Sequence, residues 1–362
     1  MKRIIAGMAA ILLAAISFFP LKAEAVSAKC AILMDAYTGR VLYEKDSDQQ
    51  ALIASTTKIM TALVVCEQCN VLDRMRIPKE AVGIEGSSMY LKEGEILTIQ
   101  ELLYGLMLHS GNDAAVALAI YCGGTVEGFV QLMNDKAREL GMVNSHFENP
   151  NGLDAPGHYS TARDMAILTA YAMKNPLFQK TVSTKSVSAG ERTLRNHNKL
   201  LWQFEGADGV KTGYTRAAGR ILVSSAVRAG RRLIAVTIDD PNDWKDHISM
   251  LEDGFENYSN YTIVEKGTCL GSVDVISGSD EAVSVYATES FQYALAKDET
   301  VDVITRVVPF VYAPVFEGKT AGFAYICVDG TVVGKVPMHF GKTVEVNKNN
   351  NVSWFKRGGV FQ

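Results

Sequence analysis

Two hydrophobic patterns divide the chain. Up to about residue 258, apolar residues recur at helical spacing in several segments, namely 55–66, 98–108, 113–121, 126–140, 161–174 and 242–258. Beyond that point, short β-branched runs alternate with turn residues at 273–276, 283–286, 301–308 and 323–328. The pattern predicts a domain with many helices followed by an all-β domain.

Strand patterns lie at both ends of the helical block. Residues 31–34 and 41–43 flank a short turn that contains glycine, which is typical of a β-hairpin. Residues 209–212, 221–227 and 233–238 form three further apolar runs of strand length. This order predicts an α+β domain with one antiparallel sheet and a helical lobe.

The second domain is predicted over residues 259–347. Within it, Asp329-Gly330 lies between two apolar runs, a strong signal for a hairpin turn. Its length suits a small β-sandwich. Residues 348–362 are polar and are predicted to form a tail, which leaves 26–258 as the first domain.

The N-terminus has the layout of a secretory signal peptide over residues 1–25. Lys2 and Arg3 precede an apolar run over residues 4–21, and small residues stand at Ala23 and Ala25. A membrane anchor is the alternative, but Pro20 interrupts a run that is already short for spanning. We therefore expect an exported protein.

Composition narrows the possible functions. The formal net charge is −4, with 48% hydrophobic and 21% charged residues, as in ordinary folded proteins. No basic stripe appears, so no nucleic-acid partner is expected. Of the six cysteines, Cys66 and Cys69 form a lone CxxC without a second pair for zinc. We expect buried or paired structural cysteines, and no metal or cofactor.

Ser55-Thr56-Thr57-Lys58 is an SxxK motif at the start of a predicted helix. The helix places Ser55 and Lys58 three residues apart on one face, with free backbone N–H groups beside the hydroxyl. A second copy, Ser353-Trp354-Phe355-Lys356, lies in the polar tail and lacks this context. The sequence therefore favours Ser55 as the functional serine.

Two further tripeptides complete the set. Ser110-Gly111-Asn112 falls at a predicted junction of two helices, and an ordinary capping turn is its other interpretation. Lys211-Thr212-Gly213 ends a predicted strand, where glycine allows close approach of a ligand or another backbone. In chain order the three motifs are SxxK, SxN and KTG, the signature of penicillin-recognising serine hydrolases.

Around these motifs the chain resembles the low-molecular-mass penicillin-binding proteins of the D-Ala-D-Ala carboxypeptidase family. The stretches that carry the resemblance are AILMDAYTGRVLYEKD, ASTTKIMTAL, GSSMYLKEGE, LTIQELLYGLMLHSGNDAAVALA, LGMVNSHFENPNGLD, HYSTARDMA, RNHNKLLW and GADGVKTGYTRAAGR. The resemblance implies a β-lactamase/transpeptidase-like catalytic domain and, less specifically, the family's C-terminal β-sandwich.

The chemistry of a serine nucleophile and the family resemblance together predict the catalytic roles of Ser55, Lys58 and Ser110. A serine needs a base, and burial with a nearby cation at Lys211 would keep Lys58 neutral enough to serve. No GxSxG elbow is present, and the six histidines are interpreted as scattered surface or core residues. We expect Ser55 to attack the bond between two D-alanines and Ser110 to relay the proton to the leaving amine.

Substrate contacts are assigned in the same way. Asn112 is expected to bond the substrate backbone, and Lys211 and Thr212 to hold the terminal carboxylate beside Gly213. The resemblance implies an oxyanion hole from the backbone N–H groups of Ser55 and Tyr214. The implied partners are peptidoglycan stem peptides ending in D-Ala-D-Ala, with β-lactams as inhibitors.

Three other functions stay open. A D-Ala endopeptidase acting on cross-links is chemically close to a carboxypeptidase. A class A β-lactamase would need a Glu-x-x-x-Asn loop between the second and third motifs, which is missing. A non-enzymatic wall-binding protein is disfavoured because all the catalytic positions are filled. Relatives commonly end in an amphipathic membrane helix, whereas the tail here is short and broken by glycines, so peripheral membrane contact is an open expectation.

Overall fold

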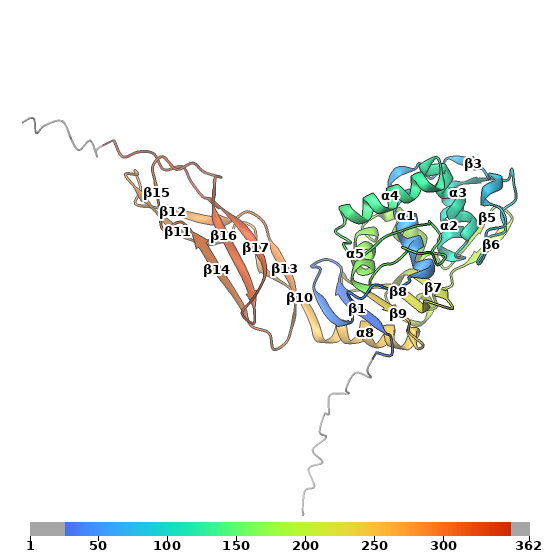
Figure 1. Cartoon of the computed structure of the whole chain (residues 1–362). Helices are drawn as coiled ribbons and strands as arrows, with labels where there is room; N and C mark the ends of the chain where they lie inside the picture. Colours follow the sequence, from blue (N-terminus) through green and yellow to red (C-terminus); the bar gives the residue numbers. More distant parts are fainter. Residues whose placement is uncertain (1–25, 349–362) are drawn as a thin grey trace, which may run out of the picture.

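A five-stranded antiparallel sheet forms the centre of the first domain. The computed structural model describes residues 26–348 (Figure 1). The strand order is β2-β1-β9-β8-β7. The bounds are β1 (Cys30–Asp35), β2 (Val41–Lys45), β7 (Ala207–Thr215), β8 (Gly219–Arg228) and β9 (Arg231–Ile238). The predicted N-terminal hairpin and the three later strands are confirmed.

The sheet is covered on both faces because its strands alternate. Ile32 and Val223 pack into the core of the helical lobe, whereas their neighbours Leu33 and Leu222 pack with Leu251 of α8 on the other face. The helices are α1 (Lys58–Gln68), α2 (Ile99–Leu108), α3 (Asn112–Gly123), α4 (Val126–Glu139), α5 (Ala162–Ala172), α6 (Pro176–Ser183), α7 (Leu200–Gln203) and α8 (Asp243–Asn257).

Most predicted helices are confirmed to within a few residues. Thr98 caps α2, with Glu101 closing the expected capping box. One start was wrong: Ser55 lies in a 3₁₀ turn, η1 (Ala54–Thr57), and α1 begins only at Lys58. The small elements were not predicted: β3 (Arg74–Arg76), η2 (Lys79–Ala81), β4 (Ile96–Thr98), β5 (Ser186–Ala189), β6 (Arg192–Arg195), α6 and α7.

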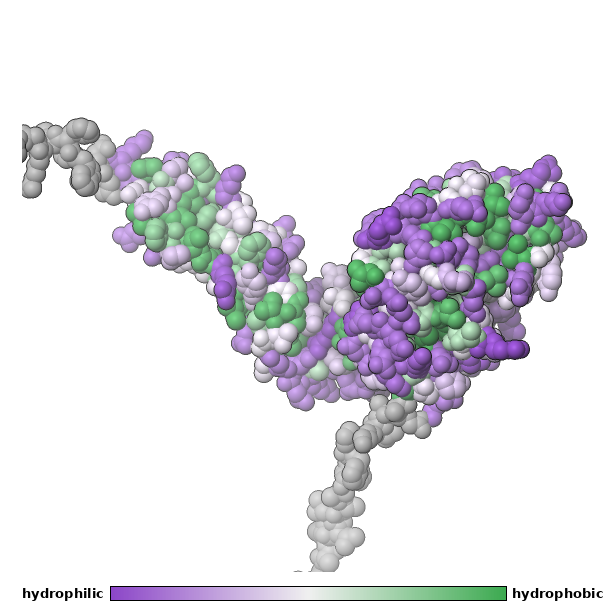
Figure 2. Space-filling model, viewed as in Figure 1, coloured by the Kyte–Doolittle hydropathy of each residue, from purple (hydrophilic) through white to green (hydrophobic). Residues whose placement is uncertain are grey.

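The C-terminal part is all-β, as expected. A six-stranded sheet has the order β14-β16-β17-β12-β11-β15, and β10 pairs separately with β13. The bounds are β10 (Tyr258–Val264), β11 (Cys269–Ile276), β12 (Ala282–Ala287), β13 (Phe291–Ala296), β14 (Val301–Val307), β15 (Phe310–Tyr312), β16 (Thr320–Val328) and β17 (Thr331–Phe340). Asp329 and Gly330, both with positive φ, turn β16 into β17. Figure 2 shows hydrophobic residues on the visible face of this part.

Arg40 links the two parts of the molecule. It lies in the turn between β1 and β2, and it forms a bidentate ion pair with Glu299 and donates to the carbonyl of Ala294. Its guanidinium carbon also lies 5.1 Å from the ring centres of both Tyr258 and Tyr293. The contact joins the β1–β2 turn to β13 and the turn that follows it.

The cysteines meet the expectation of buried or paired residues only in part. All six lie in the described part and all are free thiols. Cys30 and Cys327 are buried as expected, but Cys269 is exposed, because β15 pairs with β11 only from Asp274 onward. Cys66, Cys69 and Cys122 are free and only partly buried. No single helix within residues 26–348 is both long and apolar enough to cross a membrane, although the bent pair α3–α4 passes that test when taken together. The proposed signal peptide and tail fall outside the described residues.

Candidate active site

The three motifs meet at one cavity. Ser55 of η1, Ser110 of the α2–α3 junction, and Thr212, Gly213 and Tyr214 of β7 line a space of about 360 Å³. The cavity lies where the edge strand of the sheet meets the helical lobe. Residues from three distant parts of the chain therefore share one cleft, as the motif order predicted.

Strand β7 packs closely against the turn that carries Ser55. A Cβ on Gly213 would stand 3.3 Å from both the Ser55 nitrogen and the Ile53 carbonyl oxygen. A larger residue would push β7 away from the turn, so glycine sets the spacing between them. The backbone beside Tyr214 thereby runs next to the N–H of Ser55.

Lys58 lies fully buried beneath the cavity. Its Nζ is 2.9 Å from the Ser55 Oγ and 2.7 Å from the Asn112 Oδ1, and it also donates to the carbonyl of Asn151. The amide orientation of Asn112 is fixed, because its Nδ2 donates to the carbonyl of Glu85. Three oxygens thus surround the amine, one of them the candidate nucleophile.

Burial controls the charge on both lysines. Desolvation lowers the pKa of Lys58 well below its ordinary value, and the positive charge of Lys211 lowers it further. Desolvation also lowers the pKa of Lys211, to about 7. Burial therefore favours the neutral form of the Lys58 amine, which is the form that a base for serine requires.

Two residues that are expected to contact the substrate form hydrogen bonds within the protein. Asn112 was expected to meet the substrate backbone, but both ends of its amide are engaged by Lys58 and Glu85, and its side chain lies below the cavity. Lys211 is also buried, and its Nζ donates to the carbonyl of Thr212 at 2.9 Å. The motif lies inside β7 and not at its end, because pairing with β8 continues to Thr215.

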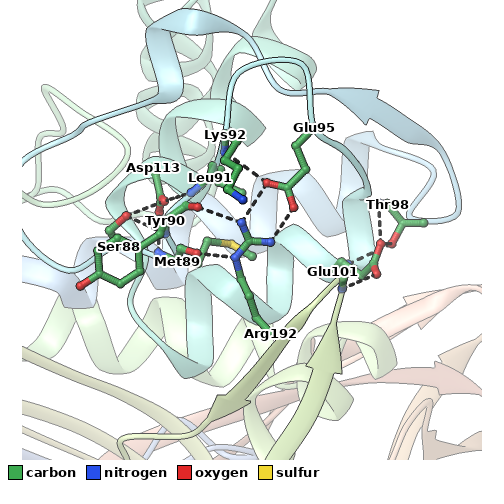
Figure 3. Close-up of polar contacts among 11 residues, drawn as sticks. Ser88, Met89, Tyr90, Leu91, Lys92, Glu95, Thr98, Glu101, Asp113 and Arg192 are labelled. Carbon is green, nitrogen blue, oxygen red and sulfur yellow. Dashed lines mark hydrogen bonds and ion pairs between the residues drawn. The ribbon is translucent and has the colours of Figure 1, made fainter.

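Asp113 holds a wall of the cavity in place. Its carboxylate accepts from the backbone N–H groups of Met89 and Leu91, both at 3.0 Å, and from the Ser88 hydroxyl at 2.6 Å (Figure 3). Ser87, which lines the cavity, accepts the backbone N–H of Asn112 at 2.7 Å. The loop between η2 and β4 is therefore fixed to the start of α3.

Arg192 of β6 fixes the same loop from its other side. It pairs with both oxygens of Glu95 and donates to the carbonyls of Met89 and Tyr90 (Figure 3). Such a bidentate pair holds geometry as well as charge. Sequence reasoning missed Arg192, since no local pattern relates it to a loop about one hundred residues earlier.

A second unforeseen support is the loop over residues 148–158. His158, which was interpreted as one of the scattered histidines, contacts the Thr57 hydroxyl at 2.8 Å. Its Nδ1 accepts the N–H of Glu148, so the proton lies on Nε2 and is donated to Thr57. Burial lowers the pKa of His158 to about 4, which keeps the ring neutral. The 148–158 loop thus supports the SxxK turn through the bond from His158 to Thr57.

No group of three or more His, Cys, Asp or Glu side chains suited to a metal ion occurs in residues 26–348. The cavity brings together a serine hydroxyl, a buried amine and the KTG strand. A serine paired with a buried lysine, a second serine and a KTG strand define the penicillin-recognising serine hydrolases.

Comparison with known proteins gives the family. Residues 19–242 match the D-alanyl-D-alanine carboxypeptidase peptidase family, and residues 258–346 match the penicillin-binding protein 5 C-terminal domain. The chain belongs to the D-alanyl-D-alanine carboxypeptidase family. This finding confirms the resemblance seen in the motifs and the predicted pairing of a catalytic fold with a C-terminal β domain.

Three relatives illustrate the similarity. The D-alanyl-D-alanine carboxypeptidase DacF of Bacillus subtilis is 33% identical over 91% of this chain and 88% of its own. The crystal structure of penicillin binding protein 5 from Haemophilus influenzae is 30% identical, with a TM-score of 0.79 over 88% of this chain and 98% of that chain. A Streptomyces K15 DD-transpeptidase mutant is 36% identical, with a TM-score of 0.61 over 64% of this chain and 98% of that chain.

Proposed function

We propose that the chain is an exported serine D-Ala-D-Ala carboxypeptidase that trims peptidoglycan stem peptides through an acyl-enzyme on Ser55. The proposal places catalysis in residues 26–258 and gives the β domain, residues 259–347, a supporting role. It rests on family membership and, above all, on the surroundings of the Lys58 amine.

Proton counting explains why Lys58 suits the role of base. A neutral amine has two N–H donors and one lone pair. The carbonyl oxygens of Asn151 and of the Asn112 side chain can only accept, so they take the two N–H groups. The lone pair is then left for the third neighbour, the hydroxyl of Ser55, 2.9 Å away. Deprotonation of Lys58 therefore turns this contact into one that accepts the serine proton.

The reaction follows from this arrangement. Ser55 Oγ attacks the carbonyl carbon between the two D-alanines while its proton passes to Lys58. The backbone N–H groups of Ser55 and Tyr214 stabilise the oxyanion, and losing one such donor typically costs about 10²–10³ in rate. Ser110, which lines the same cavity, passes the proton to the departing D-alanine nitrogen. Water then hydrolyses the ester and restores Ser55.

The KTG strand supplies the carboxylate contact. Thr212 lines the cavity, and Lys211, buried on the face of β7 that meets the SxxK turn, is a charge that also lowers the pKa of Lys58. Gly213 allows the substrate to lie close to β7. A β-lactam, which mimics the D-Ala-D-Ala end, is expected to acylate Ser55 and to leave slowly.

Penicillin labelling tests the nucleophile. A Ser55→Ala variant should not retain labelled benzylpenicillin, because the ester cannot form. The matched control is Ser353→Ala, which removes the serine of the second SxxK and should label like the wild type. Retention of label by Ser55→Ala, located by intact mass and peptide mapping, would contradict the assignment.

Product analysis separates the carboxypeptidase from its alternatives. Release of free D-alanine from a pentapeptide is expected, with slower cleavage of cross-linked dimers. Faster dimer cleavage would indicate the endopeptidase, and rapid turnover of penicillin would indicate a β-lactamase.

Two further experiments test export and membrane contact. N-terminal sequencing of the mature protein tests cleavage after Ala25. Fractionation of cells that produce the protein with or without residues 348–362 tests membrane contact by the tail.

A further inference from the structure

Three of the free cysteines form a cluster on the helical lobe. Cys66 lies in the last turn of α1, Cys69 follows the end of that helix, and Cys122 lies in the last turn of α3. All three are partly buried and pack at the edge of the same hydrophobic core. The proposed mechanism uses none of these thiols.

The packing of α1 against α3 brings two of the thiols into contact. Beside Cys122, the hydroxyl of Tyr121 donates to Asp73 Oδ2 at 2.8 Å, in the segment that follows α1. Cys69 is no longer helical, because its φ of −116° and ψ of 145° are extended. Its thiol donates a hydrogen bond to the Cys122 sulfur. Two cysteines from distant parts of the chain are therefore direct neighbours.

The reactivity of the three thiols differs. Burial raises the pKa of Cys66 to about 12, so this thiol stays protonated at neutral pH. The hydrogen bond from Cys69 lowers the pKa of Cys122, because it stabilises the thiolate. Since the thiolate is the nucleophile in thiol–disulfide exchange, Cys122 is the cysteine of the cluster that reacts first.

We propose that Cys69 and Cys122 form an oxidation site, at which a disulfide joins the C-terminal ends of α1 and α3. The Cys122 thiolate attacks one sulfur of an external disulfide, whose S–S bond breaks and releases one thiol. Cys69 then loses its proton to solvent and attacks the Cys122 sulfur, which releases the second external thiol. The two cysteines together lose two electrons and two protons, and the external disulfide is reduced to two thiols.

The disulfide adds a second link between two helices that are already joined at their catalytic ends. α1 begins at Lys58 and α3 at Asn112, and these side chains are hydrogen-bonded at 2.7 Å. Closing a loop of about 50 residues restricts the unfolded chain, which stabilises the folded protein. Oxidation in the cell rests on the export proposed above, because disulfides persist outside the cytosol.

The first experiment maps the bond. Reduced protein is treated with oxidised glutathione, the remaining thiols are alkylated, and the protein is digested. Cleavage after Glu67 separates Cys66 from Cys69, so peptide masses before and after reduction identify the partner of Cys122. A bond between Cys69 and Cys122 is expected. A bond to Cys66, a lasting glutathione adduct, or alkylation of both Cys69 and Cys122 would overturn the inference.

The second experiment compares oxidised and reduced samples of each variant. In the wild type, oxidation should raise the melting temperature by about 5–15 °C. Cys69→Ser and Cys122→Ser should lose this difference, whatever their stability in the reduced form. Cys66→Ser, the matched control from the same cluster, should keep the difference.

Equal melting temperatures of the oxidised and reduced wild type, or loss of the difference in Cys66→Ser, would contradict the proposed link. Neither measurement depends on catalysis. Absence of penicillin acylation and of D-alanine release by the wild type would therefore refute the proposed function, but it would leave the mapped bond standing.

Discussion

At the scale of single residues, the cavity depends on a lysine that is held away from water. Full burial removes the hydration that stabilises an ammonium, and the neighbouring charge of Lys211 adds repulsion. The acceptors Asn112 and Asn151 orient the amine but bear no charge, and the carboxylate of Asp113, the smallest of the three causes, raises the pKa of Lys58 too little to offset the lowering. Lys58 can therefore be both well bonded and neutral.

The acid side of the pH profile of acylation depends on the pKa of Lys58. Lys58 acts as a base only when deprotonated, so acylation by penicillin should fall as the pH drops through its pKa. Lys211→Gln removes a positive charge that lowers this pKa, so the pKa of Lys58 should rise and the acid limb should move to higher pH. Acylation rates measured from about pH 5 to 10 would show the shift. An unchanged or acid-shifted limb would mean that another group is the base.

At the scale of elements, the SxxK turn is held by two neighbouring segments. β7 approaches it at Gly213, and the 148–158 loop supports it through Asn151 and His158. Gly152 lies at the tightest point: its φ is +84°, and a Cβ there would stand 1.9 Å from the carbonyl oxygen of Ala54, the residue before Ser55. The loop and the turn can share this space only while residue 152 is glycine.

Gly152→Ala should consequently displace the nucleophile turn. We expect penicillin acylation to fall by at least about tenfold, with a lower melting temperature, because a backbone carbonyl must move. Gly141→Ala is the matched control: its φ is +72°, but a Cβ there meets nothing within 4 Å. It should lose about 1–2 kcal/mol from the left-handed backbone alone and acylate normally. Equal effects of the two variants would exclude the steric explanation.

At the scale of the whole molecule, Arg40 is a specific link between the catalytic domain and the β domain. It combines the Glu299 ion pair with contacts to two tyrosine rings, one from the start of β10 and one from β13. A cation fixed by several partners restrains orientation better than an isolated surface pair. The catalytic cavity draws none of its lining from the β domain.

Arg40→Ala should therefore loosen the two domains without impairing the chemistry. Small-angle scattering should show a broader distribution of shapes, while D-alanine release from a soluble pentapeptide stays within about twofold of the wild type. Arg306→Ala, which removes an arginine over Tyr325 inside the β domain, is the comparison and should leave the scattering unchanged. Identical scattering from Arg40→Ala and the wild type would count against the link.

Local patterns in the sequence were sufficient to predict most of the secondary structure and the residues of the three motifs. The helical periods, the Thr98–Glu101 cap and the Asp329-Gly330 turn depend on residues within one or two turns of each other, so they could be predicted. The order of the three motifs likewise predicted that Ser55, Lys58, Ser110 and the KTG strand lie around one cavity, because the expected chemistry requires those residue types together. The family comparison then confirmed the class of enzyme.

The tertiary structure alone decided which groups surround the catalytic amine and where the cavity ends. The carbonyl of Asn151 comes from 93 residues beyond Lys58, and any residue type could have offered it. Arg192 pairs with Glu95, which lies 97 residues earlier in the chain. Arg220 meets Asp243 only because β8 and α8 pack together. Such contacts depend on how elements pack and not on local spacing, which is why neither the full lining of the cavity nor the hydrogen bonds of Asn112 to Lys58 and Glu85 followed from the sequence.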